Sequence, residues 1–128
     1  MIPNDRRYTK DHEWVQIDGD LATIGLTEYA QNQLGDIVYV ELPQTGETLE
    51  AGARMAVVES VKAASDVFTP VGGEVVEANE ELDGTPEQIN EAPWTAWIAR
   101  IKVRDMNEGE LLDAVAYEAV VQAEEAEA

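Results

Sequence analysis

Lys62 is the residue whose type and surroundings point most directly to covalent chemistry. It lies in the stretch AVVESVKAASDVFTP, between Val61 and two alanines, and no other lysine occurs between Lys10 and Lys102. Short apolar segments flank it, so the chain must reverse direction there, which places Lys62 at or beside the tip of a hairpin. A group attached at such a tip could visit several active sites while it stays tethered. A plain solvent-exposed lysine is the commoner explanation for a lysine in a turn.

Other familiar catalytic arrangements are missing from the sequence. The chain has no cysteine and one histidine, His12, so it lacks thiolate chemistry and the two or three histidines of the usual catalytic zinc sites. HEWVQ begins like a zinc-protease motif but has Gln16 where the second histidine would stand. Neither a glycine-rich phosphate loop nor a Gly-x-Ser-x-Gly elbow is present. We therefore expect a protein that catalyses no reaction by itself and binds no metal.

The overall charge narrows the range of partners. Twenty-seven acidic and eight basic residues give a net charge of -19, which repels nucleic acids and anionic membranes and favours a partner with a basic docking surface. No apolar stretch is long enough to span a bilayer, and the charged N-terminal segment does not resemble a signal peptide. We expect a cytoplasmic, acidic monomer in which residues 1–128 form a single domain.

Short strand-like segments, separated by glycine, proline and acidic turns, dominate the chain and predict a sandwich or barrel. Asp18 and Gly19 are expected to supply the positive-φ residues of a first hairpin, and Gly72 and Gly73 to form a later turn. In DIVYVEL the alternation predicts that Ile37, Tyr39 and Glu41 share one side and Val38, Val40 and Leu42 the other. The seven or so expected strands include EWVQI, LATIGL, DIVYVEL, RMAVVES, DVFTP, GEVVEAN and WIARIKV.

Two segments have the pattern of helices. TEYAQNQLG begins with Thr27, a fair N-cap, and ends at Gly35, which suits a helix C-terminus. The C-terminal segment begins with Asn107 and has Glu110 three residues later, the spacing of a capping box, so we expect a helix at about 107–123. We expect an apolar stripe on this helix to pack on the β core, and a partner-binding helix is the less favoured alternative. The stripe consists of Leu112, Val115, Ala116, Ala119, Val120 and Ala123.

The segment ESVKAASD, which contains Lys62, closely resembles the lipoyl-attachment motif of the glycine cleavage system H proteins. RYTKDHEWV, IGLTEYAQNQLGDIVYVELPQTGETLEAG, PVGGEVVEANEEL and PEQIN are similar to that family in the same order, over about residues 6–120. Biotin carriers usually have methionine on both sides of their lysine, whereas Val61 and Ala63 stand there in this chain. One stretch departs from the family: PWTAW, Pro93 to Trp97, replaces its usual Gly-x-Gly-Trp turn.

The resemblance implies a fold, a cofactor and a set of partners. The fold would be a mostly β, lipoyl-domain-like barrel-sandwich hybrid of two small antiparallel sheets, with a short helix after the second expected strand and a C-terminal helix. Lys62 would carry lipoate as a swinging arm, with Glu59, Val61 and Ala63 completing the attachment motif. The arm would take the aminomethyl group of glycine from the glycine decarboxylase to the aminomethyltransferase. Dihydrolipoamide dehydrogenase would reoxidise the dithiol, and a lipoylating enzyme would attach the arm.

The resemblance also suggests a pocket for the loaded arm. Glu13 lies in the family's HEW segment and Asp66 closes the attachment motif, so both could hold the aminomethyl ammonium, with Asp11 and His12 as further candidates. Two other functions remain open at this stage. The chain could be a lipoyl carrier or lipoate relay for another complex, or it could be an interaction module whose Lys62 is never modified.

Overall fold

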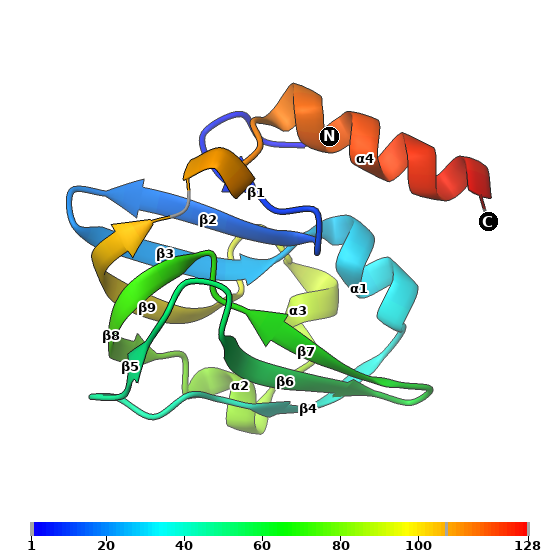
Figure 1. The fold of residues 1–128 in the computed structure, drawn as a ribbon. Helices are drawn as coiled ribbons and strands as arrows, with labels where there is room; N and C mark the ends of the chain where they lie inside the picture. The colour runs from blue at the N-terminus through cyan, green and yellow to red at the C-terminus, as the bar shows by residue number, and fades with distance from the viewer. Residues whose placement is uncertain (1, 107, 128) are drawn as a thin grey trace.

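The computed structural model describes residues 2–106 and 108–127 and places their strands in two open antiparallel sheets (Figure 1). The larger sheet has the order β1-β2-β3-β9-β8-β5 and the smaller the order β4-β6-β7. The expected mostly β fold of two antiparallel sheets is confirmed. The strands are β1 (Arg7–Tyr8), β2 (Glu13–Asp18), β3 (Leu21–Leu26), β4 (Ile37–Glu41), β5 (Thr48–Leu49), β6 (Arg54–Ser60), β7 (Ala64–Phe68), β8 (Val71–Ala78) and β9 (Trp97–Met106).

Four helices and one 3-10 turn are described: α1 (Glu28–Leu34), α2 (Glu81–Gly84), α3 (Gln88–Glu91), α4 (Ala114–Glu127) and η1 (Glu108–Glu110). The first helix follows β3 and has the predicted caps. The Thr27 hydroxyl accepts a hydrogen bond from the Ala30 backbone N–H at 3.2 Å, and Gly35 ends the helix with a φ of 82°. Among the described residues, no helix has the length and apolar character needed to cross a membrane.

The two sheets enclose the main apolar core. Its fully buried side chains come from both sheets and include Ile24, Val58, Val67, Val75 and Ile101. A separate aromatic cluster of Tyr8, Trp14 and Tyr117 lies where α4 packs against β1 and β2. Burial of these side chains removes apolar surface from water and so holds the helix and both sheets together.

Two of the predicted turns differ from expectation. In the β2–β3 hairpin Gly19 has a φ of 64°, but Asp18 is the last ladder residue of β2 and has no positive φ. Gly72 and Gly73 lie inside β8, at a shift in its pairing with β9, so the prediction of a turn there is wrong. A Cβ atom on Gly73 would lie 1.9 Å from the Lys102 carbonyl oxygen, which explains why glycine occupies this strand position.

The strict alternation predicted for β4 is also wrong. Ile37 and Val40 are buried, whereas the two residues between them, Val38 and Tyr39, are each about half exposed. The pairing of β4 with β6 shifts between Ile37 and Tyr39. Such a bulge inserts an extra residue into one strand, and here it turns two consecutive side chains outward.

The C-terminal helix begins later and faces the sheet differently than predicted. Its first residue is Ala114, and the Asp113 carboxylate accepts the Ala116 backbone N–H at 2.8 Å as the cap. The predicted cap, Asn107, lies outside the described residues, and Glu110 belongs to η1. Most of the predicted apolar stripe is exposed, whereas Tyr117 is buried. The predicted range 107–123 is therefore wrong, because the chain first forms η1 and a bridge to β1.

Candidate functional site

Lys62 lies at the tip of the β6–β7 hairpin, as the sequence predicted. The last paired residues of the ladder are Glu59 and Ala64, and Val61, Lys62 and Ala63 form the loop between the strands. The Ser60 hydroxyl lies 3.3 Å from the backbone N–H of Lys62 and 3.1 Å from that of Ala63, and accepts both. The Ser60 N–H donates to the Ala63 carbonyl at 2.8 Å. The backbone of the tip is thereby fixed, although Lys62 and both its neighbours are exposed.

Helix α1 supports this tip from the side. The Val61 N–H donates to the Asp36 carbonyl at 3.1 Å, which joins the hairpin to the chain just after the helix. A Cβ atom on Gly35 would lie 3.3 Å from Lys62 Cε, so the aliphatic part of the lysine passes over a residue without a side chain. Among the residues that the structure describes, no carboxylate pairs with the Lys62 ammonium. Within the described part of the chain, the tip therefore presents an amine without an ion pair.

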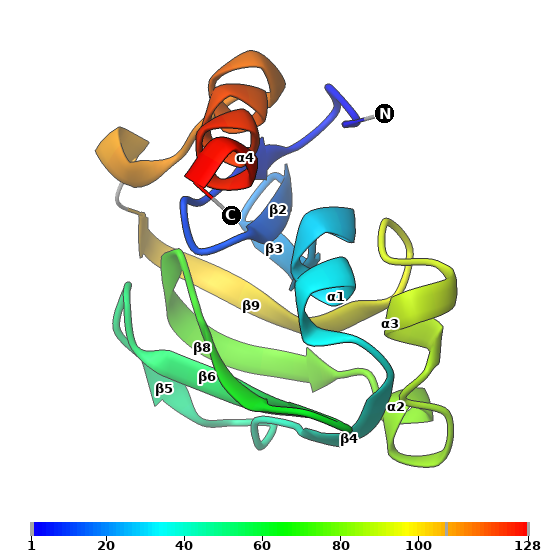
Figure 2. The same cartoon turned by 90° about the vertical axis from the view of Figure 1, so that its right-hand side faces the viewer.

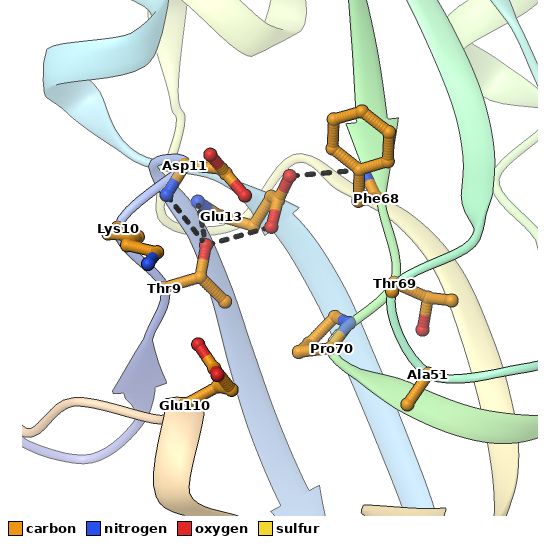
Figure 3. A pocket seen from close by; sticks show the side chains of 10 residues that line it. Thr9, Lys10, Asp11, Glu13, Ala51, Phe68, Thr69, Pro70 and Glu110 are labelled. Carbon is orange, nitrogen blue, oxygen red and sulfur yellow. Dashed lines mark hydrogen bonds between the residues drawn. The ribbon is translucent and has the colours of Figure 1, made fainter. Parts of the chain in front are cut away.

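A cavity of about 180 Å³ opens at the other end of β7 (Figure 3). Its walls come from the β1–β2 connection, the segment before β6, the end of β7 and η1. They consist of Thr9, Lys10, Asp11, Glu13, Ala51, Gly52, Phe68, Thr69, Pro70 and Glu110. Carboxylates and apolar surface thus face one another in the same cavity, an arrangement suited to a ligand with an apolar body and a cationic end.

Glu13 is the buried carboxylate of this cavity, with 2% of its surface exposed. The Thr9 hydroxyl donates to Oε1 at 2.8 Å and the Phe68 backbone N–H donates to Oε2 at 3.0 Å (Figure 3). Burial raises the pKa of Glu13 to about 7, since the loss of hydration outweighs these two hydrogen bonds. Near neutral pH a small change in its surroundings therefore decides whether Glu13 carries a charge.

The structure brings together two of the four residues predicted to hold the arm. Glu13 and Asp11 both line the cavity. Asp66 does not line it, but lies exposed on β7 with its carboxylate 3.8 Å from the Arg54 guanidinium. His12 does not line it either, because its ring turns towards α4. Its Nδ1 lies 2.8 Å from the Tyr117 hydroxyl and its Nε2 lies 3.0 Å from the Glu124 carboxylate.

Several residues of the tip and cavity were not singled out from the sequence. Thr9 and Phe68 position the Glu13 carboxylate, and Glu110 enters the cavity wall from a segment that was predicted to be helical. Ser60 had a usable signal, because a serine beside a short loop often binds the backbone of the turn. Within residues 2–106 and 108–127, no group of three or more metal-ligating side chains comes together.

Comparison with known proteins decides the family. A family model described as Glycine cleavage H-protein matches residues 6–124, almost the whole chain. The chain belongs to this family. It is 54% identical over 125 residues to the glycine cleavage system H protein of Thermus thermophilus, covering 96% of this chain and 98% of that protein. It is 57% identical over 117 residues to the corresponding protein of Phenylobacterium zucineum, covering 90% and 97%.

A solved structure agrees with the fold. The crystal structure of a glycine cleavage system H protein from Mycobacterium marinum aligns with a TM-score of 0.86 at 40% identity, covering 92% of this chain and 97% of that one. Family membership confirms the function predicted from the sequence, that of a lipoyl carrier of the glycine cleavage system.

Proposed function

We propose that Lys62 is the attachment site, that lipoate is joined to its ε-amine by an amide bond, and that the chain itself catalyses no step of glycine cleavage. The observation that carries this proposal is the geometry of the hairpin tip. Its backbone is held by the Ser60 hydroxyl and by the Asp36 carbonyl just after α1, while the lysine and its neighbours Val61 and Ala63 are exposed. An enzyme can therefore reach the amine without displacing packed side chains.

The residues around Lys62 fit a long neutral arm. Amide formation removes the charge of the ammonium, and no ion pair with another described residue is lost in the process. Gly35 leaves room beside Cε for the arm to turn. When bound, lipoate supplies a disulfide that accepts the aminomethyl group and a dithiol that is later reoxidised, so the chain's own task is presentation.

The proposed partners follow from this cycle. They are the glycine decarboxylase, the aminomethyltransferase, dihydrolipoamide dehydrogenase and the enzyme that attaches lipoate. All four would have to reach Lys62 at the exposed tip, where Glu59 adds a negative charge on β6. The proposed compartment is the cytoplasm.

The Glu13 cavity receives the cargo end of the loaded arm in this proposal. Strand β7 leads from the tip to Phe68, whose backbone N–H holds the Glu13 carboxylate. An ammonium beside Glu13 favours the ionised carboxylate, and the resulting charge-assisted hydrogen bonds keep the nitrogen protonated. The apolar wall formed by Phe68 and Pro70 limits the access of water to the same end of the arm.

A reconstituted exchange reaction tests the carrier function. The lipoylated chain, incubated with glycine decarboxylase, glycine and labelled bicarbonate, is expected to support exchange of label into glycine. Unmodified chain and Lys62→Arg chain serve as controls and are expected to give no exchange. Lipoylated chain that supports no exchange would favour a carrier for another complex, and chain that the lipoylating enzyme cannot modify would favour an interaction module.

A further inference from the structure

A second cavity lies between α1, α4 and the loop before β9. Its volume is about 150 Å³, comparable to a cavity that takes up one benzene-sized molecule. Tyr29, Trp94 and Tyr117 contribute aromatic walls, and Glu28 and Glu125 contribute carboxylates from the two helices. We call it the Tyr29 groove. Its size suits the end of one side chain rather than a folded peptide.

The aromatic walls of the Tyr29 groove are held in place by a neighbouring ring. Tyr8 stacks on Tyr117 with centroids 4.8 Å apart and meets Trp94 edge-on at 6.1 Å. The same cluster already accommodates one guanidinium from within the chain, because Arg6 lies 4.6 Å above Trp14 and 5.8 Å from Trp94. Aromatic faces attract cations, and the attraction strengthens where water is excluded.

Two carboxylates give the groove its charge. Glu28 lies in the first turn of α1 and Glu125 near the end of α4, and both are exposed. Within residues 2–106 and 108–127, neither forms an ion pair or a side-chain hydrogen bond. Burial, Glu124 and Glu125 together raise the pKa of Tyr29, so negative potential reaches the aromatic wall. Aromatic faces beside two carboxylates match an arginine, which stacks on rings and pairs with carboxylates.

We propose that the Tyr29 groove is a docking site for an arginine side chain of an enzyme that acts on the Lys62 arm. The identity of the partner rests on the proposed function, whereas the chemistry of the groove does not. The net charge of -19 selects a basic partner surface. An arginine that enters the groove would be stacked and charge-paired at once, which would fix the orientation of the enzyme relative to the tip.

The position of the groove supports this partner. Figures 1 and 2 show α1, the end of α4 and the β6–β7 tip on the same side of the molecule. Glu28 is the first residue of α1, and Gly35 follows the last one and lies against Lys62 Cε. At about 1.5 Å per residue, the helix places Glu28 about 10 Å from Gly35 along its axis. A partner that buries about 800 Å² of this protein covers a patch about 30 Å across. One enzyme can therefore engage Lys62 and the groove together.

The groove itself is tested with a small probe. N-acetyl-arginine methylamide is titrated into the full chain while the NMR signals of the Trp94 indole and the Tyr29 ring are followed. We expect saturable shifts with wild type, at least fivefold weaker binding with Glu28→Gln/Glu125→Gln, and no shifts with the uncharged citrulline analogue. Equal shifts with the citrulline analogue, or no shift with the arginine compound, would overturn the proposal.

Steady-state kinetics test the partner, with the lipoylated chain as substrate for the three enzymes of glycine cleavage and the unmodified chain as substrate for the enzyme that attaches lipoate. For at least one of the four enzymes, Glu28→Gln/Glu125→Gln is expected to raise the KM for the carrier about fivefold at unchanged kcat. Tyr29→Leu should raise it about threefold and Tyr29→Phe should not. The matched control Glu50→Gln/Glu74→Gln also removes two negative charges, from exposed residues away from the groove, one just after β5 and one within β8. It is expected to leave KM unaltered.

The two ways of failing can be told apart. If the groove variant and the control variant have the same KM with every enzyme while Lys62 is lipoylated and shuttles its cargo, the docking proposal is refuted and the carrier function stands. If Lys62 is not lipoylated, the proposed function fails, and the assignment of the partner fails with it. The arginine titration then still decides whether the groove binds a guanidinium.

Discussion

Glu13 combines burial with two hydrogen bonds, and its charge is therefore linked to folding. With a pKa of about 7 in the folded chain and 4.5 in the unfolded chain, the folded state holds the extra proton between these values. The contribution of Glu13 to the free energy of unfolding therefore decreases as pH rises from 4.5 to 7, by about 3 kcal/mol in total. Below pH 4.5 and above pH 7 it changes little.

Substitution by glutamine tests this linkage. Glu13→Gln can still accept from Phe68 and contact the Thr9 hydroxyl, but it does not titrate. Urea unfolding at pH 5 and pH 8 should show the variant gaining about 2.5 kcal/mol relative to wild type at the higher pH. Glu50→Gln, on an exposed carboxylate, serves as the control and should show no such gain. A difference between Glu13→Gln and wild type that stays constant with pH would mean that Glu13 is already ionised.

Glu13 and Asp66, both predicted from the sequence to hold the aminomethyl ammonium, are expected to differ in their effect on the loaded arm. Glu13 lines the cavity, whereas Asp66 lies exposed beside Arg54. We predict that Glu13→Gln speeds the loss of ammonia from the loaded chain about tenfold, because a charge-assisted hydrogen bond is removed. Asp66→Asn should have a much smaller effect. The release of ammonia after loading by the decarboxylase measures both. Equal retention in Glu13→Gln and wild type would rule out the cavity as a protective site.

At the scale of elements, the β6–β7 hairpin determines how enzymes reach Lys62. Ala63 is exposed, and its backbone N–H and carbonyl are both engaged by Ser60. We predict that Ala63→Glu slows lipoylation several-fold with little change in melting temperature, because the added carboxylate pairs with the amine and crowds it. Ala63→Ser is the matched small substitution and should be modified at the wild-type rate. If all three chains are modified equally fast, access at the tip does not limit attachment.

The hairpin and α1 were predictable from the sequence because the signals for them are local. Apolar strands flank Lys62, and Thr27 and Gly35 mark the ends of the helix within nine residues. The bulge in β4 and the Gly72–Gly73 position in β8 depend on the partner strand, which local spacing does not reveal. The start of α4 was also missed, because the bridge between Tyr8 and Leu112 takes precedence over a capping-box pattern.

The candidate site likewise has one part with a local sequence signal and one part that depends on distant segments. Lys62 was found from its own segment and from the family motif around it. The Glu13 cavity draws its walls from four separated segments, so Thr9, Phe68 and Glu110 could be assigned only once the fold had brought them together. His12 was placed with Glu13 because the two are adjacent in sequence. A φ of 71° at His12 turns its side chain towards α4 instead.

At the scale of the whole molecule, the net charge of -19 is expected to govern encounter with partners. Attraction to a basic enzyme surface speeds association, and salt screens it once the Debye length falls to about 10 Å near 0.1 M. We predict that the kcat/KM of the partner enzymes, with the lipoylated chain as substrate, falls several-fold between about 0.01 M and 0.15 M salt. Free lipoamide, which is uncharged, serves as the control substrate. A kcat/KM that does not change with salt would exclude electrostatic steering.

The central claim is that Lys62 carries the lipoyl arm, and intact mass spectrometry after treatment with a lipoylating enzyme tests it most directly. We predict a mass increase of one lipoyl group per chain, mapped to the peptide that contains Lys62. Lys62→Arg should fold normally and show no increase, because a guanidinium does not serve as the amine for amide formation. An unmodified wild-type chain, or a lipoyl group on Lys62→Arg, would contradict the account.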